Sequence, residues 1–282
     1  MNGTGPLLGV QLTEAQVHAY LDVIGVRRAP PSFDSLRDLI RAQLTRVPFE
    51  NVSKLFYRKH RGLRSLPGIE LYLDGIRHDH FGGTCYPNNM YFHGLLVALG
   101  YDASLCGADM PSGPDVHCAI IVTIDGREYI VDVGYAAPFY EPLPRDLDQD
   151  LLIRFGRDCY ALRPRDEQAR SRLDLYREGE LVHGYLLKPT PRGPEHFDDA
   201  VRNSYGDQAA FMNALMLVRF GESSSIVIYN LSLIRATAGS YTIDRLGSRE
   251  ELVEVIIRLF EIREDVVRDV VASLGPLGSV YG

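Results

Sequence analysis

Two glycines and a cysteine at the start of a predicted helix form the first candidate site for chemistry. The segment from residue 80 to residue 89 reads HFGGTCYPNN, so Cys85 closely follows the Gly82–Gly83 pair. A thiol in the first helical turn meets unpaired backbone N–H groups and the positive end of the helix dipole, which favour the thiolate. The same N–H groups, that of Cys85 included, can form one arm of an oxyanion hole. A buried structural cysteine after a glycine turn explains this local pattern equally well.

The second candidate site is a predicted β-hairpin over residues 117–133. Its two mostly apolar halves are separated by the dipeptide Asp125-Gly126, which is typical of a two-residue type I′ turn. Such a turn pairs Ile124 with Arg127, and this pairing fixes the register of the whole hairpin.

This register brings a histidine close to an aspartate. Asp132 lies opposite Ala119, and His117 projects from the same face of the hairpin as a diagonal neighbour, with Cα atoms about 7 to 8 Å apart. A carboxylate that holds one imidazole nitrogen leaves the other free as a base for a nucleophilic cysteine. On spacing alone, a histidine at a strand end and an unrelated surface aspartate fit slightly better.

The other candidate groups indicate neither a metal centre nor a disulfide framework. The segment from His78 to His80 places two imidazoles two residues apart, but no second cluster of ligands accompanies them, so we expect no metal. No CxxC pair occurs, and four cysteines are too few to staple a chain of this length. These cysteines are Cys85, Cys106, Cys118 and Cys159.

Composition predicts a soluble globular protein for which nucleic acid is an unlikely partner. The 282 residues are 45% hydrophobic, enough to bury one large core or a few small ones. A formal net charge of -7 leaves no basic face for nucleic acid or an anionic membrane, although a few arginines or helix N-termini can bind the phosphates of a CoA thioester. Residues 1–10 lack a leader pattern, and no run of about 18 apolar residues occurs, so we expect a cytoplasmic location.

Periodicity divides the chain into a helical first hundred residues, a strand-rich middle and a mixed tail. Predicted helices with capping or stop signals cover residues 13–25, 35–47, 85–100 and 250–260. Strand-like runs separated by turn residues cover 119–124, 128–133, 172–176, 215–219, 225–231 and 241–243. The proline-rich residues 189–194 indicate a linker or surface loop.

Three motifs, in order along the chain, resemble those of the arylamine N-acetyltransferase family. Residues 46–51 (RVPFEN) resemble its Arg-x-Pro-Phe-Glu-Asn motif, and residues 82–85 (GGTC) resemble its Gly-Gly-x-Cys nucleophile turn. Residues 131–134 (VDVG) match the segment around its catalytic aspartate, at the family's spacing from the histidine. Weaker similarity continues to the final helix. The resemblance implies a catalytic triad of Cys85, His117 and Asp132.

The resemblance also implies a fold and a reaction. The fold would be α+β on a papain-like cysteine-enzyme scaffold, with the triad at the first domain interface. Its domains would be a helical bundle with the nucleophile over 1–100, an antiparallel β-barrel with the histidine and aspartate over 101–208, and an α/β lid over 209–282. The reaction would be ping-pong: Cys85 takes an acetyl group from acetyl-CoA, and an aromatic amine, hydrazine or hydroxylamine attacks the acyl-enzyme.

In that reaction His117 would shuttle protons and Asp132 would fix its tautomer. Acetyl-CoA would act as a cosubstrate, and no cofactor would stay bound. The partners implied are a CoA thioester and a small aromatic amine, in the setting of xenobiotic metabolism, with the protein a monomer or a homodimer.

Two positions depart from the family pattern. The family usually has Arg before the two glycines and Glu two residues after the cysteine, whereas this chain has Phe81 and Pro87. Losing one charge of a buried pair costs roughly 3 to 5 kcal/mol, whereas losing both can be nearly neutral, so we expect a repacked site. The nucleophile chemistry would stay intact, and the arylamine specificity is open.

The RVPFEN motif predicts structural support beside the nucleophile. We expect Phe49 in the core, with Arg46, Glu50 and Asn51 fastening the helical bundle to the barrel. Phe49 and Phe139 are also candidates for the wall of the acceptor pocket.

Two other functions would use the same nucleophile. A related amide synthase would load a polyketide chain on Cys85 and release it as a lactam, and the departures at Phe81 and Pro87 fit it as well as the acetyltransferase. A papain- or transglutaminase-like cysteine hydrolase would instead take water as its acceptor.

Overall fold

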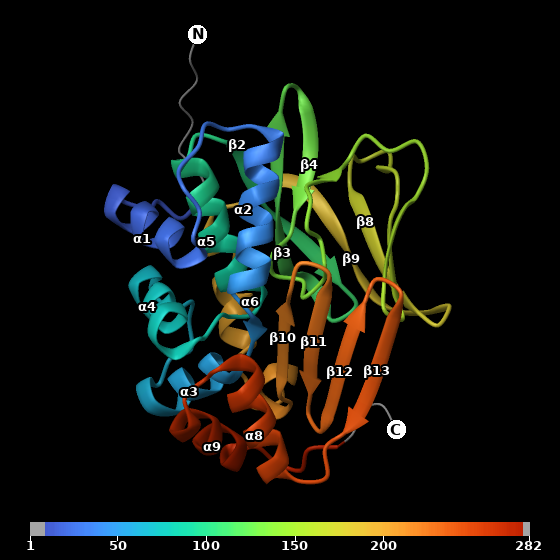
Figure 1. Ribbon diagram of the computed structural model, residues 1–282. Helices are drawn as coiled ribbons and strands as arrows, with labels where there is room; N and C mark the ends of the chain where they lie inside the picture. The colour runs from blue at the N-terminus through green and yellow to red at the C-terminus, as the bar shows by residue number, and fades with distance from the viewer. Residues whose placement is uncertain (1–8, 279–282) are drawn as a thin grey trace.

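The computed structural model describes residues 9–278, in which helices pack against two antiparallel sheets (Figure 1). This arrangement confirms the predicted α+β class. Residues 1–8, which include most of the segment considered for a leader, and residues 279–282 lie outside the described residues. Within residues 9–278, no helix is both long enough and apolar enough to cross a bilayer.

Five helices precede the large sheet. They are α1 (Glu14–Ile24), α2 (Phe33–Arg46), α3 (Val52–Arg61), α4 (Ile69–Asp79) and α5 (Cys85–Ala98). The three helices predicted in this part are confirmed as α1, α2 and α5, and α1 begins with the predicted capping box at Thr13. The sequence analysis missed α3 and α4, since each is short and no side chain caps its first turn.

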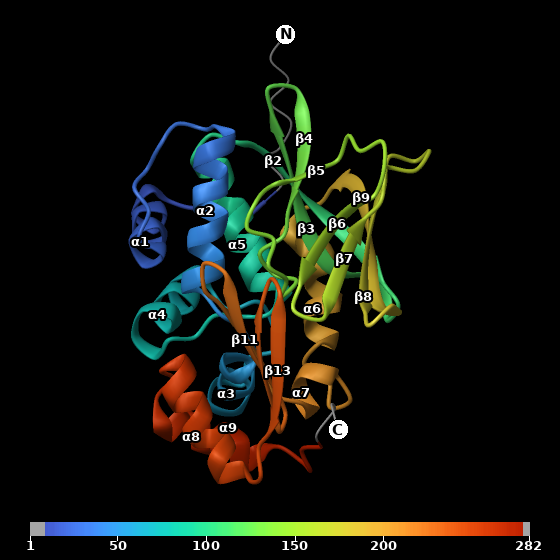
Figure 2. The same cartoon turned by 45° about the vertical axis from the view of Figure 1, so that its right-hand side comes forward.

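Eight strands form the larger sheet, which curls into a half-barrel (Figure 2). Their order is β5-β4-β3-β2-β9-β8-β7-β6. Their bounds are β2 (Asp102–Met110), β3 (Gly113–Ile124), β4 (Arg127–Val131), β5 (Leu143–Pro144), β6 (Leu151–Phe155), β7 (Asp158–Leu162), β8 (Ser171–Arg177) and β9 (Glu180–Pro191). No pairing among the described residues joins β5 to β6, so this sheet is open along that side.

The hairpin of β3 and β4 has the predicted register. Ile124 pairs with Arg127, and the two turn residues Asp125 and Gly126 have φ values of 51° and 76°, as a type I′ turn requires. Asp132 therefore follows directly after β4.

The linker predicted over residues 189–194 is wrong for residues 189–191, which belong to a strand. Strand β9 continues to Pro191, which pairs with Cys106 of β2. The register between β2 and β9 shifts at this place, and such an irregularity tolerates prolines that a regular ladder would exclude.

Five strands form the second sheet, in the order β1-β10-β11-β12-β13. Their bounds are β1 (Phe49–Glu50), β10 (Met216–Phe220), β11 (Ser224–Tyr229), β12 (Ser232–Thr237) and β13 (Ser240–Arg245). The short elements η1 (Pro194–Phe197), α6 (Asp198–Asn203) and α7 (Ala210–Asn213) precede this sheet, and α8 (Arg249–Phe260) and α9 (Glu264–Ser273) follow it.

Strand β1 shows that the first hundred residues are not purely helical. It belongs to the helical part of the chain, yet Phe49 pairs with Val218 of β10. The N-terminal part thus contributes the edge strand of the second sheet, across the domain boundary predicted at residue 209. The three domain ranges stay a prediction.

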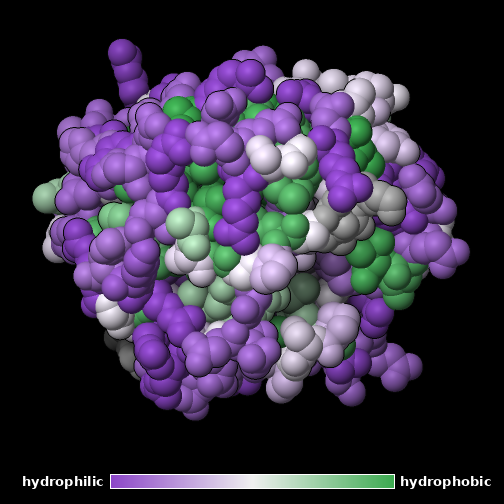
Figure 3. Space-filling view, turned by 90° about the horizontal axis from the view of Figure 1, so that it is seen from below, coloured by the Kyte–Doolittle hydropathy of each residue, from purple (hydrophilic) through white to green (hydrophobic). Residues whose placement is uncertain are grey.

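Helix α5 forms the centre of the helical part. All residues from 86 to 96 are buried, because α5 packs against α1 on one side and against β2 and β3 on another. Helices α8 and α9 lie beside α3 and share a hydrophobic core with it (Figure 1). Seen from below, hydrophobic residues gather mainly across the middle of the face among hydrophilic ones (Figure 3).

Candidate active site

The turn before Cys85 is packed so closely that only glycine fits. A Cβ atom at Gly82 would lie 1.9 Å from the carbonyl oxygen of Pro48, and one at Gly83 would lie 2.5 Å from Cγ of Pro87. The backbone N–H of Glu50 donates to the carbonyl of Gly83 at 3.1 Å. The edge strand β1 therefore holds this turn, and Cys85 begins α5 directly after it.

The buried carboxyl group of Glu50 also fixes this turn through hydrogen bonds. Oε1 of Glu50 accepts the backbone N–H of Gly82 at 3.0 Å, and its two oxygens accept the hydroxyl and the N–H of Ser53 at 2.6 and 2.8 Å. Burial raises the pKa of Glu50, although these hydrogen bonds oppose the rise. Glu50 thus supports the nucleophile turn and does not bridge to the half-barrel.

The rest of the RVPFEN motif corrects the predicted attachment. Asn51 donates to the carbonyls of Phe211 and Ala214 and accepts the N–H of Met216, all at 2.7 to 2.8 Å. The guanidinium of Arg46 lies against Gly25, at the end of α1. These side chains therefore fasten the nucleophile turn to the second sheet and to the bundle itself, because the intervening β1 pairs with β10.

His117 and Asp132 form a buried ion pair, which the hairpin register allows and the family resemblance implies. Nε2 of His117 lies 2.8 Å from Oδ2 of Asp132, and both residues are at most 3% exposed. The other ring nitrogen, Nδ1, does not face Asp132, and Cys85 lies close enough to His117 to raise its pKa. The structure thus brings all three predicted triad residues together, from α5, from β3 and from the segment after β4.

The electrostatics of His117 favour an imidazolium. Burial alone lowers its pKa, but the charge and hydrogen bond of Asp132, together with the interaction with Cys85, outweigh burial and raise the pKa to about 10. An imidazolium close to Cys85 is the partner that a cysteine nucleophile requires.

Asn89 orients the aspartate, and the sequence analysis did not identify it. Its Nδ2 donates to Oδ1 of Asp132 at 2.8 Å and to the carbonyl of Cys118 at 2.6 Å, while its Oδ1 accepts the N–H of Val133 at 3.0 Å. It lies one helical turn after Cys85, on the same face of α5. A polar residue at i+4 from the cysteine, in a mostly apolar helix, was the available signal.

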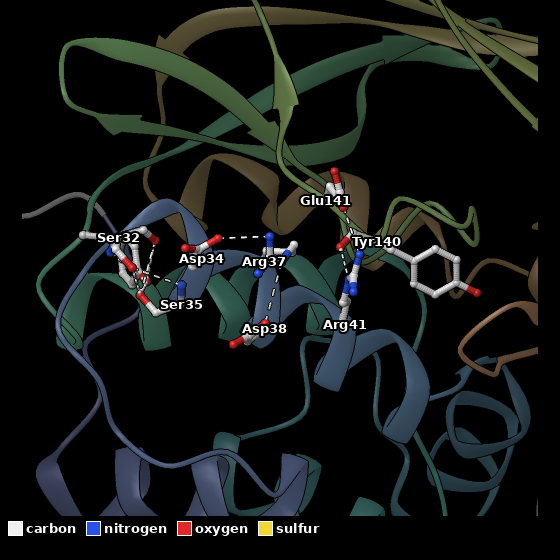
Figure 4. Close-up of polar contacts among 9 residues, drawn as sticks. Ser32, Asp34, Ser35, Arg37, Asp38, Arg41, Tyr140 and Glu141 are labelled. Atoms are coloured by element: carbon white, nitrogen blue, oxygen red, sulfur yellow. Dashed lines mark hydrogen bonds and ion pairs between the residues drawn. The ribbon is translucent and has the colours of Figure 1, made fainter.

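The segment after Asp132 touches the nucleophile directly. A Cβ atom at Gly134 would lie 2.7 to 2.8 Å from the backbone of Cys85, so glycine is required there. Figure 4 shows Arg41 of α2 reaching the far end of this segment, where it meets the carbonyl of Tyr140 and the carboxylate of Glu141 at 3.4 and 2.9 Å. The hydroxyl of Tyr140 also donates to the carbonyl of Gly221 at 2.7 Å, which ties the segment to the second sheet.

Two tyrosines pack against the imidazole of His117. The ring of Tyr185 lies at a centroid distance of 5.1 Å, and the ring of Tyr135 meets the imidazole edge-on at 5.5 Å. These rings exclude water from the His117–Asp132 pair, which strengthens its electrostatic interaction.

The structure does not place the two predicted pocket residues in the wall of a described cavity. Phe49 packs edge-on against Phe211 at 5.7 Å. Phe139 is 2% exposed and lies in the core of the half-barrel, behind Tyr135. Their role in an acceptor pocket stays a prediction.

The two departures from the family pattern lie together in the wall of a small cavity. Phe81 and Pro87 line a space of about 30 Å³ on the side of the nucleophile turn that faces α3. Lys54 of α3 lines it too, only 8% exposed, and the sequence analysis did not identify this residue. Its ammonium donates to the hydroxyl of Ser204 at 2.6 Å and lies 4.2 Å from the ring centre of Tyr205.

The ammonium of Lys54 contacts a hydroxyl and an aromatic ring, both neutral, and its pKa reflects this. Burial lowers the pKa of Lys54 to about 8, with a partial opposing effect from Cys85. None of the ion pairs found within residues 9–278 involves Lys54. The site thus holds two buried cations, of which only His117 has an anionic partner.

Among the described residues, the histidines considered for a metal and the cysteines other than Cys85 do not assemble into a second site. His80 approaches Glu261 at 3.5 Å, at the end of α4. Within residues 9–278, no group of three or more histidine, cysteine, aspartate or glutamate side chains is arranged to hold a metal ion. All four cysteines are free thiols.

A family model described as N-acetyltransferase matches residues 32–268, which is most of the chain. The chain belongs to this N-acetyltransferase family. This confirms the family predicted from the three sequence motifs. The match contains the nucleophile turn, the hairpin and both sheets.

Curated relatives of this N-acetyltransferase family member include two kinds of enzyme. Human arylamine N-acetyltransferase 1 is 30% identical over 138 residues, which is 45% of this chain and 46% of the relative. Proansamycin X synthase of Amycolatopsis mediterranei is 34% identical over 137 residues, which is 45% of this chain and 51% of the relative. The chain therefore matches about half the length of these relatives.

Solved structures of the family share the fold over nearly the whole chain. The arylamine N-acetyltransferase of Nocardia farcinica superimposes with a TM-score of 0.79 and 24% identity, covering 96% of this chain and 98% of that one. The Mycobacterium marinum arylamine N-acetyltransferase in complex with CoA superimposes with a TM-score of 0.75 and 21% identity, covering 90% and 98%.

Proposed function

We propose that this protein is an acyltransferase that carries an acetyl group from acetyl-CoA to the nitrogen of an aromatic amine, hydrazine or hydroxylamine through an acyl-Cys85 intermediate. The observation that carries the proposal is the buried His117–Asp132 pair at 2.8 Å, with Cys85 close enough to the imidazole to raise its pKa. This arrangement can activate a thiol without a metal or a bound cofactor.

The first half-reaction loads the enzyme. The proton of the Cys85 thiol resides on His117 in the thiolate–imidazolium pair, and the thiolate of Cys85 attacks the carbonyl carbon of the thioester. The backbone N–H of Cys85, in the first turn of α5, stabilises the oxyanion, and one such donor is typically worth about 3 to 4 kcal/mol. The bond from the carbonyl carbon to the CoA sulfur then breaks, and His117 returns the proton to the departing CoA thiolate.

The second half-reaction transfers the acyl group. The amine nitrogen attacks the carbonyl carbon of the acyl-enzyme, and His117 takes a proton from that nitrogen. The bond to the sulfur of Cys85 breaks, the amide leaves, and the enzyme regains its starting protonation state. Asp132, fixed by Asn89, keeps the imidazole in the required tautomer throughout.

The relatives support the donor and acceptor classes. One structural neighbour was solved in complex with CoA, and the curated relatives include arylamine N-acetyltransferases. We propose in addition that the protein works in the cytoplasm as a monomer or homodimer.

Steady-state kinetics test this function. Release of free CoA from acetyl-CoA is followed with an aromatic amine, with a hydrazine, and with no acceptor. Ping-pong transfer predicts parallel double-reciprocal plots and CoA release that depends on the amine. Equal CoA release without any acceptor would identify a hydrolase instead, and Cys85→Ala is the control that must abolish turnover.

One observation favours a second candidate, an amide synthase. Proansamycin X synthase is more identical to this chain than human arylamine N-acetyltransferase 1 over a segment of similar length. In this function Cys85 would receive a polyketide chain, and an amine of the same chain would close the lactam. Loading of Cys85 by long acyl thioesters but not by acetyl-CoA would select it over the acetyltransferase.

A further inference from the structure

A cavity of about 110 Å³ lies between the half-barrel and the second sheet. It is called the inter-sheet cavity here, and its wall includes Tyr135, Tyr160, His183, Val218, Tyr229 and Ile234. A space of this order holds one aromatic ring. Most of the wall is aromatic or aliphatic, so a planar apolar ligand fits it chemically.

One chain segment that lines the inter-sheet cavity begins next to the candidate active site. Gly134 packs on the backbone of Cys85, and the next two residues, Tyr135 and Ala136, line the cavity. The other edge of the Tyr135 ring meets the imidazole of His117 at 5.5 Å. An acceptor whose nitrogen attacks acyl-Cys85 would direct its ring along this segment into the cavity.

One hydrogen-bonded pair stands out in this wall. The hydroxyl of Tyr135 lies 2.7 Å from Nδ1 of His183, which is half-buried near the start of β9. Burial raises the pKa of Tyr135, so its hydroxyl keeps its proton. Burial also lowers the pKa of His183, and the nearby Arg177 and His117 lower it further against an opposing effect of Asp158, so the imidazole is neutral.

These protonation states fix the direction of the hydrogen bond. Tyr135 donates to Nδ1 of His183, and the single ring proton of the neutral imidazole then resides on Nε2. Since Nδ1 is occupied and the residue lines the cavity, Nε2–H is the group that His183 offers to a ligand.

We propose that His183, held by Tyr135, selects acceptors by donating a hydrogen bond to an oxygen on the far side of the acceptor ring from the reacting nitrogen. The acceptor is thus an aromatic amine with a phenolic, carbonyl or carboxylate oxygen distal to the amine. This inference rests on the proposed function for its acceptor, but the binding site itself does not depend on catalysis. His183 acts in specificity and takes no part in the chemical step.

The test compares two amines of equal size and similar nucleophilicity, 4-aminophenol and 4-methylaniline. The wild type should turn over 4-aminophenol with a kcat/KM about ten-fold or more above that of 4-methylaniline, as expected for one hydrogen bond in a half-buried site. His183→Phe should remove this preference by lowering kcat/KM for 4-aminophenol alone. His183→Gln, which places an amide donor near the position of Nε2, should restore part of it.

A binding measurement separates this inference from the proposed function. The product amides of the same two amines are titrated calorimetrically into the wild type, His183→Phe and the control His78→Phe on α4. Tighter binding of the phenolic amide to the wild type and to the control, but not to His183→Phe, supports the inference even if Cys85 accepts no acetyl group. Intact-protein mass spectrometry reports that acylation separately.

Two outcomes would overturn the inference. In one, the wild type shows no preference for the phenolic compound in turnover or in binding. In the other, His183→Phe weakens both compounds equally, which would mean that His183 only supports the wall of the cavity.

Discussion

Two buried cations lie near Cys85, and their surroundings differ in one respect. His117 is 2% exposed and faces Asp132, and its pKa rises to about 10. Lys54 is 8% exposed and faces a hydroxyl and an aromatic ring, and burial lowers its pKa to about 8. Similar burial therefore has opposite net effects, depending on whether an anion is in contact with the cation.

Under the proposed function, this difference separates a group that takes part in the reaction from one that lowers the stability of the fold. The anion beside His117 makes it a stable imidazolium that can hold and return a proton. Lys54 keeps its charge at neutral pH only at a cost in folding free energy, since a hydroxyl and a ring compensate burial incompletely. The predictions below replace one of these two cations or a residue of the network formed by His117, Asp132 and Asn89.

The largest effect is expected for Asp132→Asn. An amide at this position leaves His117 buried without its counter-ion, so the imidazolium is no longer favoured and the tautomer is wrong. We expect kcat to fall by about 10³ to 10⁴-fold, measured by CoA release with a saturating amine. Asp146→Asn, which removes an exposed partner of Arg127, is the matched control and should retain activity. A variant with near-normal kcat would show that the pair is structural.

The pH dependence of stability should have opposite signs for the two cations. A raised pKa means that the contribution of His117 is fully present below its ordinary value near 6.5 and is lost as pH rises through 10. The lowered pKa of Lys54 means that its penalty is present below pH 8 and is relieved as pH rises towards 10.5.

Urea unfolding of the wild type, His117→Gln and Lys54→Met across this range measures both differences. The free-energy difference between wild type and His117→Gln should shrink with rising pH. The free energy of unfolding of the wild type, relative to that of Lys54→Met, should increase with rising pH. Two slopes of the same sign would contradict the comparison.

At neutral pH, Lys54→Met should stabilise the protein. The drop in pKa from 10.5 to about 8 corresponds to a penalty of about 3 kcal/mol, which an apolar side chain of similar length does not incur. The lost contacts with Ser204 and Tyr205 offset part of this gain. The matched control is Lys59→Met on the same helix, which removes a half-exposed ion pair with Asp269 and should change stability by less than about 1 kcal/mol. Strong destabilisation by Lys54→Met alone would mean that the ammonium contributes more than it costs.

A smaller effect is expected for Asn89→Ala. The substitution removes three hydrogen bonds and leaves the carbonyl of Cys118 and the N–H of Val133 without their partner. We expect a loss of about 1 to 3 kcal/mol in stability and a fall in kcat of about 10 to 100-fold, as typical for a group that orients a catalytic residue. Unchanged kcat in a folded variant would remove Asn89 from the orienting network.

The parts of this site that depend on local geometry could be predicted from the sequence. The turn at Asp125-Gly126 determined the register, and the register placed His117 and Asp132 on one face. The Gly82–Gly83 pair and the start of a helix placed Cys85 in a first turn. These features depend on residues within a few positions of one another, so pattern reasoning reaches them.

The missed residues depend on packing between distant segments. Lys54 meets its partners in residues 204–205, about 150 positions further along the chain, and His183 lies about 50 positions after its partner Tyr135. Strand β1 is only two residues long, and its place in the second sheet depends on β10. No local pattern encodes such contacts, which is also why the attachment of the RVPFEN motif was predicted incorrectly.

The central claim is that Cys85 carries the acyl group. The most direct measurement is intact-protein mass spectrometry after brief incubation with acetyl-CoA, for the wild type, Cys85→Ala and the control Cys159→Ser, followed by peptide mapping. The account predicts the addition of one acetyl group to the wild type and to Cys159→Ser, located on Cys85, and its release on addition of an aromatic amine. Equal acetylation of Cys85→Ala, or an acetyl group on any other residue, would contradict the account.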